Sequence, residues 1–226
     1  DRYDYTNMAY GVSDTSRYET KNQQISLQNQ WNSPFGTWNF GASHLHQTLD
    51  STIGFLTKSR NTDSAWVGYQ YEQNRHHLQL NGRFDRLSDL NSKNFLTGAI
   101  NYGYDITPSW RELAGYSNGF AAPSFNQLYY PPYCYGGYCF DSSNPNLKTE
   151  KANYAQLGVQ WAQTHYGLRV TYFDTRYRDK IANDVNYIPQ NIARARAKGV
   201  ETHAWYGLHG WNMDAGVPYQ EVRDGD

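Results

Sequence analysis

The segment Tyr154-Ala-Gln-Leu-Gly-Val-Gln-Trp161 changes character at every step. Ala155, Leu157, Val159 and Trp161 are apolar, and glutamine or glycine separates them. Successive side chains on a β-strand point to opposite faces of the sheet. The segment is therefore predicted to be a strand with one apolar and one polar face.

The same alternation recurs along most of the chain. It is clear at residues 25–31, 38–43, 78–85, 200–207 and 211–220. No stretch carries apolar residues at helical spacing for long enough to predict a helix. We expect an all-β fold of about ten antiparallel strands, from residues 18–31 to residues 211–220.

The composition restricts the class of protein. Of 226 residues, 38% are hydrophobic and 16% aromatic, and the formal net charge is −1. No run approaches the roughly 20 apolar residues of a membrane helix. The near-zero charge argues against a nucleic-acid partner, and the aromatic content argues against disorder. An extracellular β domain and a membrane β-barrel with a polar lumen both fit.

The connections between the predicted strands alternate between short and long. The short turns are at residues 32–36, 74–75, 105–109, 164–165 and 209–210, and the long loops at 50–63, 87–94, 119–150 and 179–196. This rhythm, with strands of about 10 residues, is typical of bacterial outer-membrane barrels.

Tryptophan positions favour the same fold. Five of the seven tryptophans lie at or beside the predicted short turns, where a membrane barrel carries an aromatic girdle. They are Trp31, Trp38, Trp110, Trp161 and Trp211. The alternative is that tryptophan simply favours strands.

Two cysteines, Cys134 and Cys139, flank a Tyr-Gly-Gly-Tyr turn. The spacing allows a small disulfide-closed loop, which indicates an oxidising compartment. Free thiols or a metal site are the alternative, although a metal site needs two further ligands. The chain opens on Asp1 without a signal peptide, which predicts a processed chain or a piece of a longer one.

Four motifs in order resemble signatures of the TonB-dependent outer-membrane receptors. They are GYSNGFAAPSFNQLY at residues 115–129, NPNLKTEK at 144–151, YFDTRYRDKI at 172–181 and NIARARAKGVE at 191–201. Within that family the chain is most similar to the receptors for cobalamin (vitamin B12), through AAPSFNQLY at 121–129, RNT at 60–62 and QNQW at 28–31. The resemblance implies a 22-stranded antiparallel transmembrane β-barrel in the bacterial outer membrane.

On this resemblance, residues 1–226 are part of the barrel domain, and the plug domain and terminal strands lie outside them. Thr149 stands where the family often has proline. Pro218 and Glu221 are expected to interrupt a strand that the family continues. Pro218 also lacks a ladder N–H, which suits an edge strand or a bulge. Pro123, Asn144, Pro145 and Gly199, within the motifs, are expected to be structural rather than ligand contacts.

The loop at 119–150 is the richest candidate for ligand binding, because aromatic rings offer rigid contacts to a large, partly apolar ligand. Its candidates are Phe125, Tyr129, Tyr130 and Tyr133. The alternative is a loop that folds onto itself. Arg60 and Asn61, near the same rim, are candidate donors to a ligand amide, with surface hydrogen bonding as the alternative.

The opening Asp1-Arg-Tyr-Asp-Tyr5 carries candidates that come from the resemblance alone. It implies that Tyr3 contacts the ligand and that Asp4 binds calcium, although a shift of two residues would select Tyr5 and Thr6 instead. Calcium takes about 6–8 oxygen ligands, so most would come from elsewhere. No covalent cofactor is expected.

Catalysis has little support. His44 and His46 share a strand face without an evident third metal ligand, and no catalytic triad, phosphate loop or paired carboxylate occurs. We expect a non-enzymatic active transporter that imports cobalamin and is energised by the TonB complex through the plug, among outer-membrane lipid. The alternatives are a siderophore or haem receptor, a soluble cell-surface β domain that binds glycans, and a passive porin.

Overall fold

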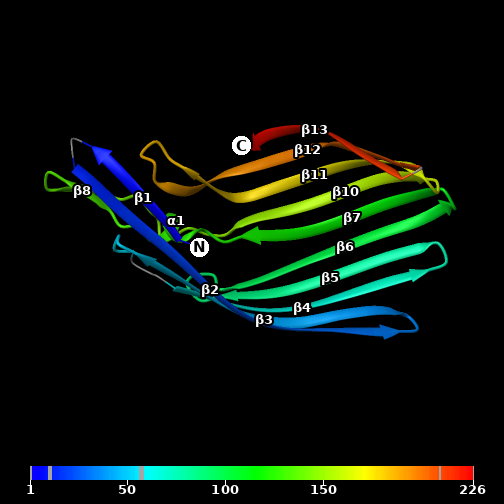
Figure 1. Cartoon of the computed structure of the whole chain (residues 1–226), viewed down its shortest axis with the longest axis horizontal. Coiled ribbons are helices and arrows are strands. Elements are labelled where there is room, and N and C mark those ends of the chain that lie inside the picture. The colour runs from blue at the N-terminus through cyan, green and yellow to red at the C-terminus, as the bar shows by residue number, and fades with distance from the viewer. Residues whose placement is uncertain (1, 10–11, 56–58, 209, 226) are drawn as a thin grey trace.

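The computed structural model describes residues 2–9, 12–55, 59–208 and 210–225. Side chains are described for these residues except 2–15, 133, 135, 192–193 and 224–225. Within these ranges the chain is almost entirely strand, as the alternation predicts (Figure 1). No helix in them is long and apolar enough to cross a membrane.

Eleven strands of the described chain form one open antiparallel sheet, in which neighbours in space are neighbours in sequence. The strands are β1 (Arg2–Ala9), β2 (Val12–Ser33), β3 (Gly36–Ser51), β4 (Ser59–Gln73), β5 (His76–Leu87), β6 (Asn94–Thr107), β7 (Trp110–Ala121), β10 (Glu150–Ala162), β11 (Tyr166–Asn183), β12 (Pro189–Leu208) and β13 (Trp211–Gly225). The β7–β10 connection contains a helix, α1 (Phe125–Tyr129), and a hairpin of β8 (Tyr133–Tyr135) and β9 (Tyr138–Phe140).

The all-β prediction is confirmed, with one strand more than expected. β1 lies before the first predicted strand, and most strands are longer than the predicted 10 residues, since β2 alone has 22. β11 and β12 extend far into the loop predicted at 179–196. Four of the predicted short turns are present and gather at one end of the sheet (Figure 1). The fifth, at 209–210, includes residue 209, which lies outside the described residues, but β12 ends and β13 begins at that same end. We call this the short-turn end and the opposite one the long-loop end.

One face of the sheet is apolar across every strand from β2 to β13. Leu27, Ala42, Ala65, Phe84 and Leu96 follow one another from strand to strand along the pairing register. No described element covers this face: 68% of Leu27 and 75% of Leu96 are exposed. Along the middle of the strands the apolar residues thus lie on this uncovered face, which is the face that contacts lipid in a barrel.

The other face is polar and ordered by hydrogen bonds between strands. Ser64 of β4 donates to Asp85 of β5 over 2.6 Å, and Arg83 donates to the same carboxylate over 2.9 and 3.0 Å. Gly167 shows how tightly this face packs, because a Cβ there would lie 2.1 Å from the ring of Trp205. Glycine is thus required where the indole lies across the neighbouring strand.

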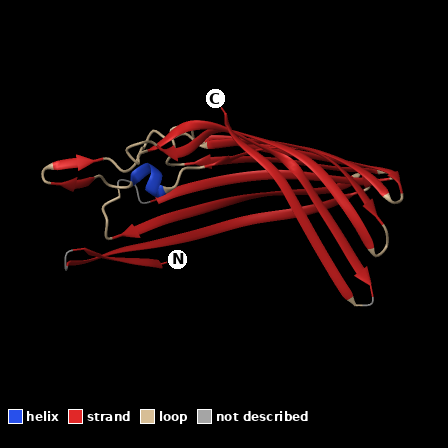
Figure 2. Cartoon of the chain, turned by 90° about the horizontal axis from the view of Figure 1, so that it is seen from above, coloured by secondary structure: helices blue, strands red, loops and turns tan. Residues whose placement is uncertain are grey.

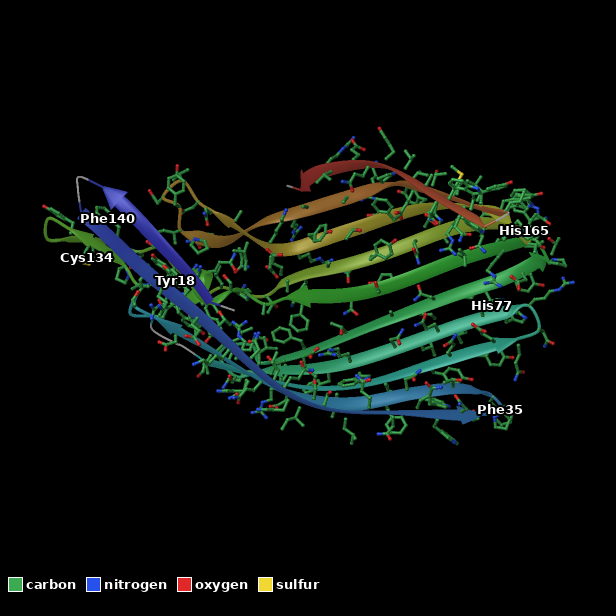
Figure 3. All side chains as sticks on the ribbon, viewed as in Figure 1. Tyr18, Phe35, His77, Cys134, Phe140 and His165 are labelled. Carbon is green, nitrogen blue, oxygen red and sulfur yellow. A yellow bond between two sulfur atoms is a disulfide. The ribbon has the colours of Figure 1, made fainter. Side chains whose placement is uncertain are left out.

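The five tryptophans predicted to lie beside the short turns are at the short-turn end. Trp31 is opposite Trp38, and Trp110 is opposite Trp161. Trp211 begins β13 on the same apolar face. Figure 3 marks this end with Phe35, His77 and His165, and the opposite end with Tyr18, Cys134 and Phe140.

One expectation about the end of the chain needs correction. Pro218 and Glu221 do not interrupt a strand, because β13 pairs with β12 without a break from Trp211 to Gly225. β13 is an edge strand, as proline suits, since such a strand uses only part of its N–H donors in the ladder. Gly199, which is expected to be structural, lies within β12, and its missing Cβ makes room for the carbonyl of Tyr219.

Candidate functional site

Apolar side chains that are buried in the described chain gather mainly at the long-loop end. We call this cluster the loop-end core: Leu49, Phe55, Leu87, Leu90, Phe95, Leu128, Tyr129 and Leu147. Phe95 is opposite Asp85 in the register, which places the core on the polar face of the sheet. The long loops therefore fold inward over the end of the wall rather than outward.

Helix α1 supplies the centre of this core. Ser124 caps it by accepting from the Gln127 N–H, and the Gln127 side chain accepts from the Ser124 N–H in return. This capping box fixes a helix of a single turn, whose intrinsic stability is otherwise low. Leu128 is fully buried and Tyr129 is 8% exposed. The helix is visible at one end of the sheet in Figure 2.

An ion pair locks α1 to the strands. The Arg60 Nε of β4 donates to Asp89 Oδ1 in the β5–β6 loop over 2.7 Å, and an Arg60 Nη donates to the Pro123 carbonyl over 2.9 Å. The guanidinium also lies 5.1 Å from the centre of the Phe125 ring. The Arg60 and Asp89 side chains are 9% and 4% exposed, so three separate segments meet at a desolvated charge pair.

Tyr129 completes what we call the loop-end clamp, namely Arg60, Asp89 and Tyr129. Its hydroxyl donates to the Asp89 carbonyl over 2.6 Å. Burial, and then the nearby Asp89 charge, raise the pKa of Tyr129 to about 12. The tyrosine therefore stays neutral and keeps its donor at any physiological pH.

Phe125 and Tyr130 are partly exposed beside the core. Tyr130 meets Phe55 edge-on at 5.5 Å between ring centres. Both rings pack against the core and keep part of their surface accessible.

The predicted pair Arg60 and Asn61 is divided between the two faces of β4. Asn61 Oδ1 lies 2.6 Å from His46 Nδ1 on the apolar face, whereas Arg60 points into the loop-end core. His44 contacts Asp63 on the same outward face. Among the described residues, no group of three or more His, Cys, Asp or Glu is placed to hold a metal ion.

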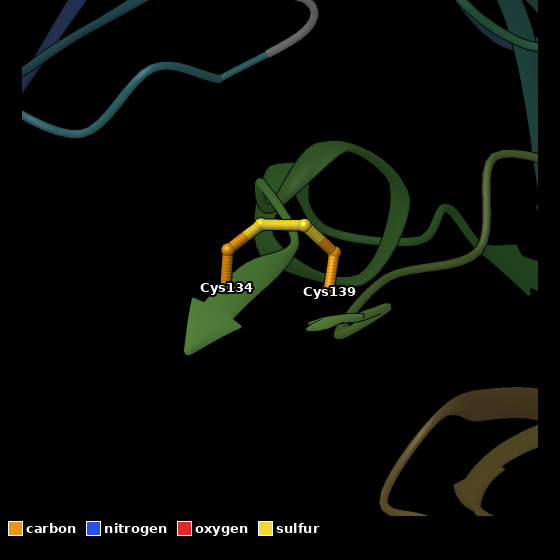
Figure 4. The surroundings of a disulfide bond; sticks show 2 residues. All are labelled: Cys134 and Cys139. Atoms are coloured by element: carbon orange, nitrogen blue, oxygen red, sulfur yellow. A yellow bond between two sulfur atoms is a disulfide. The ribbon is translucent and has the colours of Figure 1, made fainter. Parts of the chain in front are cut away.

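The predicted disulfide is present between Cys134 and Cys139 (Figure 4). It joins β8 to β9 across a turn in which Gly136 and Gly137 have φ of 59° and 85°, which favours glycine. Tyr138 and Phe140 are 74% and 61% exposed on this hairpin, which extends beyond the end of the sheet (Figure 2).

The side chains of Tyr3, Asp4 and Tyr133 lie outside the described residues. The backbone of β1 places Tyr3 opposite Tyr18 and Asp4 opposite Arg17, at the long-loop end. Tyr133 begins β8 of the hairpin. These candidates therefore approach one end of the sheet from two distant parts of the chain.

A polar recess of about 240 Å³ lies on the polar face near the short-turn end. Arg111 in its lining donates to Asp105 Oδ1 over 2.6 Å, and His77 Nε2 is 2.8 Å from Asp105 Oδ2. Gln79, Asn101 and Gln156 add amide groups. The sequence shows these residues only as the polar half of the alternation.

The loop-end clamp was only partly visible in the sequence. Asp89 gives no signal in the sequence, because it stands in a polar loop with no motif around it. Asn144, which is expected to be structural, makes hydrogen bonds within the protein, and so does Asn191 of another motif. Asn144 donates to the Pro189 carbonyl, and Asn191 donates to the Lys148 carbonyl, so each ties the β7–β10 loop to the β11–β12 region.

The family profile described as "TonB dependent receptor-like, beta-barrel" matches residues 1–226. The chain belongs to this family of TonB-dependent receptors. The match confirms an outer-membrane barrel and a non-enzymatic role. In such a barrel the apolar face contacts lipid, the polar face lines the interior, and the long-loop end is external.

Two curated proteins resemble the chain, one along most of its length and the other along about half of it. The vitamin B12 transporter BtuB of Photobacterium profundum is 23% identical over 224 residues, which cover 94% of this chain and 35% of the relative. Lactoferrin-binding protein A of Neisseria meningitidis is 32% identical over 113 residues, covering 46% of this chain and 12% of the relative. The chain thus spans about a third of the length of the first.

Two solved structures share the fold. The siderophore receptor PirA of Pseudomonas aeruginosa superposes with a TM-score of 0.76 at 20% identity, over 92% of this chain and 41% of that one. The copper transporter OprC gives a TM-score of 0.74 at 17% identity, over 95% and 39%. The open sheet therefore corresponds to part of such a barrel.

Proposed function

We propose that this chain forms part of the wall and the external mouth of an active transporter that captures and imports cobalamin. The observation that carries the proposal is the similarity to BtuB along 94% of the chain. The external loops are built on a fixed core, which suits binding, because ligand-binding loops need a rigid support.

The ligand would meet aromatic surface at the long-loop end. Phe125 and Tyr130 offer partly exposed rings above the loop-end core, and the hairpin that begins at Tyr133 carries exposed Tyr138 and Phe140. A large, partly apolar ligand gains dispersion and hydrogen bonds from such rings. In this proposal Arg60 and Tyr129 act by holding α1 in place, since both are buried in the clamp.

Tyr3 and Asp4 complete the proposed mouth. Tyr3 would contact the ligand, and Asp4 would donate a carboxylate to a calcium ion together with residues elsewhere in the protein. Asn61 lies on the opposite face of β4 from α1. It would contact the ligand only if an external loop brought the ligand to that face.

Transport would need partners beyond this sheet. We propose that further strands close the wall into a 22-stranded barrel, that a plug domain fills it, and that the TonB complex acts on that plug. The polar recess around His77 and Arg111 offers charged and amide groups to such a plug. Charged and amide groups of this kind bind a polar surface through water and direct hydrogen bonds.

The test is cobalamin binding by the full-length protein in detergent. We expect saturable binding that weakens when a calcium chelator is added. The double change Tyr138→Ser with Phe140→Ser should raise Kd about tenfold, a loss of roughly 1.4 kcal/mol. The matched control is Val185→Ser with Tyr187→Ser, which removes two exposed apolar residues from the β11–β12 loop and should leave Kd unchanged.

Other outcomes discriminate between the alternatives. Tight binding of a ferric siderophore or haem without cobalamin binding would reject the substrate and keep the class of receptor. Steady conductance in planar bilayers would favour a passive porin. A protein that stays monodisperse without detergent and binds glycans would reject the transporter altogether.

A further inference from the structure

Two histidines of β3 share the outward face of the sheet toward the long-loop end. His44 and His46 are two residues apart on one strand, so their side chains point the same way. On the neighbouring strand β4, Asp63 is opposite His44 and Asn61 is opposite His46 (Figure 1). Each imidazole contacts the residue opposite it. Nδ1 of His44 lies 2.6 Å from Asp63 Oδ1, and Nδ1 of His46 lies 2.6 Å from Asn61 Oδ1.

These two contacts determine which nitrogen of each ring carries the proton. A carboxylate oxygen and an amide carbonyl oxygen can only accept a hydrogen bond, so Nδ1 is the donor in both rings. Each neutral imidazole therefore keeps an unprotonated Nε2 with a lone pair. Among the described side chains, neither Nε2 has a hydrogen-bond partner. The His44 side chain is 52% exposed and His46 is half-buried, so both lone pairs remain available.

The two lone pairs point to the same side of β3. Both Nδ1 atoms point toward β4, and Nε2 lies across the ring from Nδ1, so both Nε2 atoms point away from β4. Side chains on the same face of a strand begin about 7 Å apart. One metal ion with bonds of about 2.1 Å to imidazole can join two Nε2 atoms that are up to roughly 4 Å apart. A tilt of the two rings toward each other closes this difference.

The other described histidines lack this arrangement. His77 and His203 each use Nε2 in a contact with an aspartate. His76 and His165 lie at the short-turn end, and neither has a second histidine two residues away. In the part of the chain that the structure describes, the pair on β3 is therefore the one place where two free imidazole nitrogens share a strand face.

The pair lies where the apolar band of the outward face ends. On β3 the outward residues of 38–42 are apolar, and the two histidines follow them. Gln23 of β2 is exposed and opposite His46, so its amide oxygen can approach an ion bound there. The described residues offer no cluster of three His, Cys, Asp or Glu ligands, which leaves coordination positions open to water. Arg86 is on β5, on the side of β3 from which the Nε2 atoms point away.

We infer that His44 and His46 form a chelating site for a divalent transition-metal ion, Cu²⁺ or Zn²⁺. Their Nε2 atoms bind the ion, Asp63 and Asn61 hold the two rings through the Nδ1–H groups, and Gln23 and water complete the coordination. Imidazole nitrogen suits these ions, whereas Ca²⁺ prefers oxygen ligands. Carboxylate and carbonyl partners of this kind orient histidine ligands in metal sites. The inference does not depend on the transported substrate.

The test uses the full-length protein in detergent with Cu²⁺ as the probe, because Cu²⁺ binds such ligands most tightly. Electron paramagnetic resonance should show a bound ion with two nitrogen ligands. His44→Asn with His46→Asn should abolish that signal and raise Kd for Cu²⁺ at least tenfold. The matched control, His76→Asn with His165→Asn, removes two histidines from the short-turn end and should leave the signal and Kd unchanged. Zn²⁺ should displace the bound Cu²⁺, and Ca²⁺ should not.

A change in a partner of the rings tests their orientation without removing either ligand. Asp63→Ala deletes the acceptor of the His44 Nδ1–H and should weaken Cu²⁺ binding about tenfold. Asp63→Asn keeps an acceptor oxygen and should lose much less, and equal losses would overturn the role given to Asp63. Heat-modifiable mobility on gels reports that each variant assembles.

Three results would overturn the site itself. The first is equal Cu²⁺ binding by the double histidine variant and its control. The second is a signal with one nitrogen ligand, because a single histidine would then bind the ion. The third is displacement of Cu²⁺ by millimolar Ca²⁺, because the ion would then be held by carboxylates.

Discussion

The strand wall and the loop-end core are stabilised in different ways. Along the wall, Leu27 and Leu157 are exposed by 68% and 64%, whereas in the core Leu128 has no exposed surface. Wall residues thus depend on the membrane for their apolar surroundings. The core resembles a small soluble domain, with a capped helix, packed leucines and a buried ion pair. Residues of the wall are therefore stabilised by lipid, and residues of the core by contacts within the protein. The same substitution should have different effects in these two environments.

The largest effect is expected from Asp89→Ala in the loop-end clamp. It leaves the guanidinium of Arg60 buried without a counter-charge, at a local cost of about 3–5 kcal/mol. Hydrogen exchange of residues 122–147 should accelerate, while heat-modifiable mobility of the barrel stays normal. Glu19→Ala is the control, because it removes an exposed partner of Lys21, worth about 0–1 kcal/mol.

A double variant separates loss of the ion pair from burial of an unpaired charge. Arg60→Met with Asp89→Leu replaces the whole pair by apolar groups of similar size. It should recover much of the protection lost in Asp89→Ala, since a buried pair is often replaceable as a unit. If exchange stayed as fast as in the single variant, the ion pair would have a role beyond neutralising its own charge.

Leu128→Ala should be nearly as damaging to the core. It removes a fully buried side chain, at a cost of about 2–5 kcal/mol. Limited proteolysis of the β7–β10 connection should become faster. Leu157→Ala, the same change on the lipid face, should cost only about 0.5 kcal/mol and leave proteolysis unchanged.

The stability of the wall should depend on the charge of its outward side chains, whereas the stability of the core depends on the volume of its side chains. Leu157→Arg places a cation on the outward face between Ala114 and Tyr172, and should cost about 2–4 kcal/mol near the bilayer midplane. Unfolding in urea from lipid vesicles measures this loss. Gln156→Arg on the polar face is the control, and equal destabilisation by both changes would contradict the assignment of the two faces.

Cys134→Ser with Cys139→Ser should loosen only the hairpin of β8 and β9. A disulfide that closes so short a loop contributes about 2 kcal/mol by chain entropy. Hydrogen exchange should rise in residues 133–140 and stay constant in α1. Acceleration in both segments would show that the hairpin and the loop-end core are a single cooperative unit.

The smallest effect is a dependence on alkaline pH. Because the folded pKa of Tyr129 is about 12 and its ordinary value is 10, its contribution is fully present below pH 10. Stability is then lost as pH rises from about 10 toward 12. In a spectrophotometric titration, Tyr129→Phe should remove one late-ionising tyrosine. Loss of an early-ionising one instead would contradict its burial.

The sequence predicts the wall better than the core. The alternation at Tyr154–Trp161 identifies a strand and its two faces, because each side chain there is expected to contact either lipid or the barrel interior. β1 and the extensions of β11 and β12 escaped it, since those segments carry no apolar face of their own. The sequence indicates Arg60 and Tyr129 as candidate ligand contacts, but it does not indicate Asp89. Their association depends on three segments that are distant in sequence, and no local pattern encodes it.

The meander order of the sheet has a consequence for how the wall forms. Every main strand in the described part of the chain pairs with the next main strand, and the connection from β7 to β10, residues 122–149, is much longer than the others. Most contacts therefore close small loops, which cost little entropy. Each hairpin can add to the edge strand of the growing sheet, so the sheet can form in the order of the sequence. Pairing of β7 with β10 closes the largest of these loops. The capped helix α1 and the disulfide-linked β8–β9 hairpin restrict the conformations of this loop before the pairing, and so lower the entropy cost of closing it.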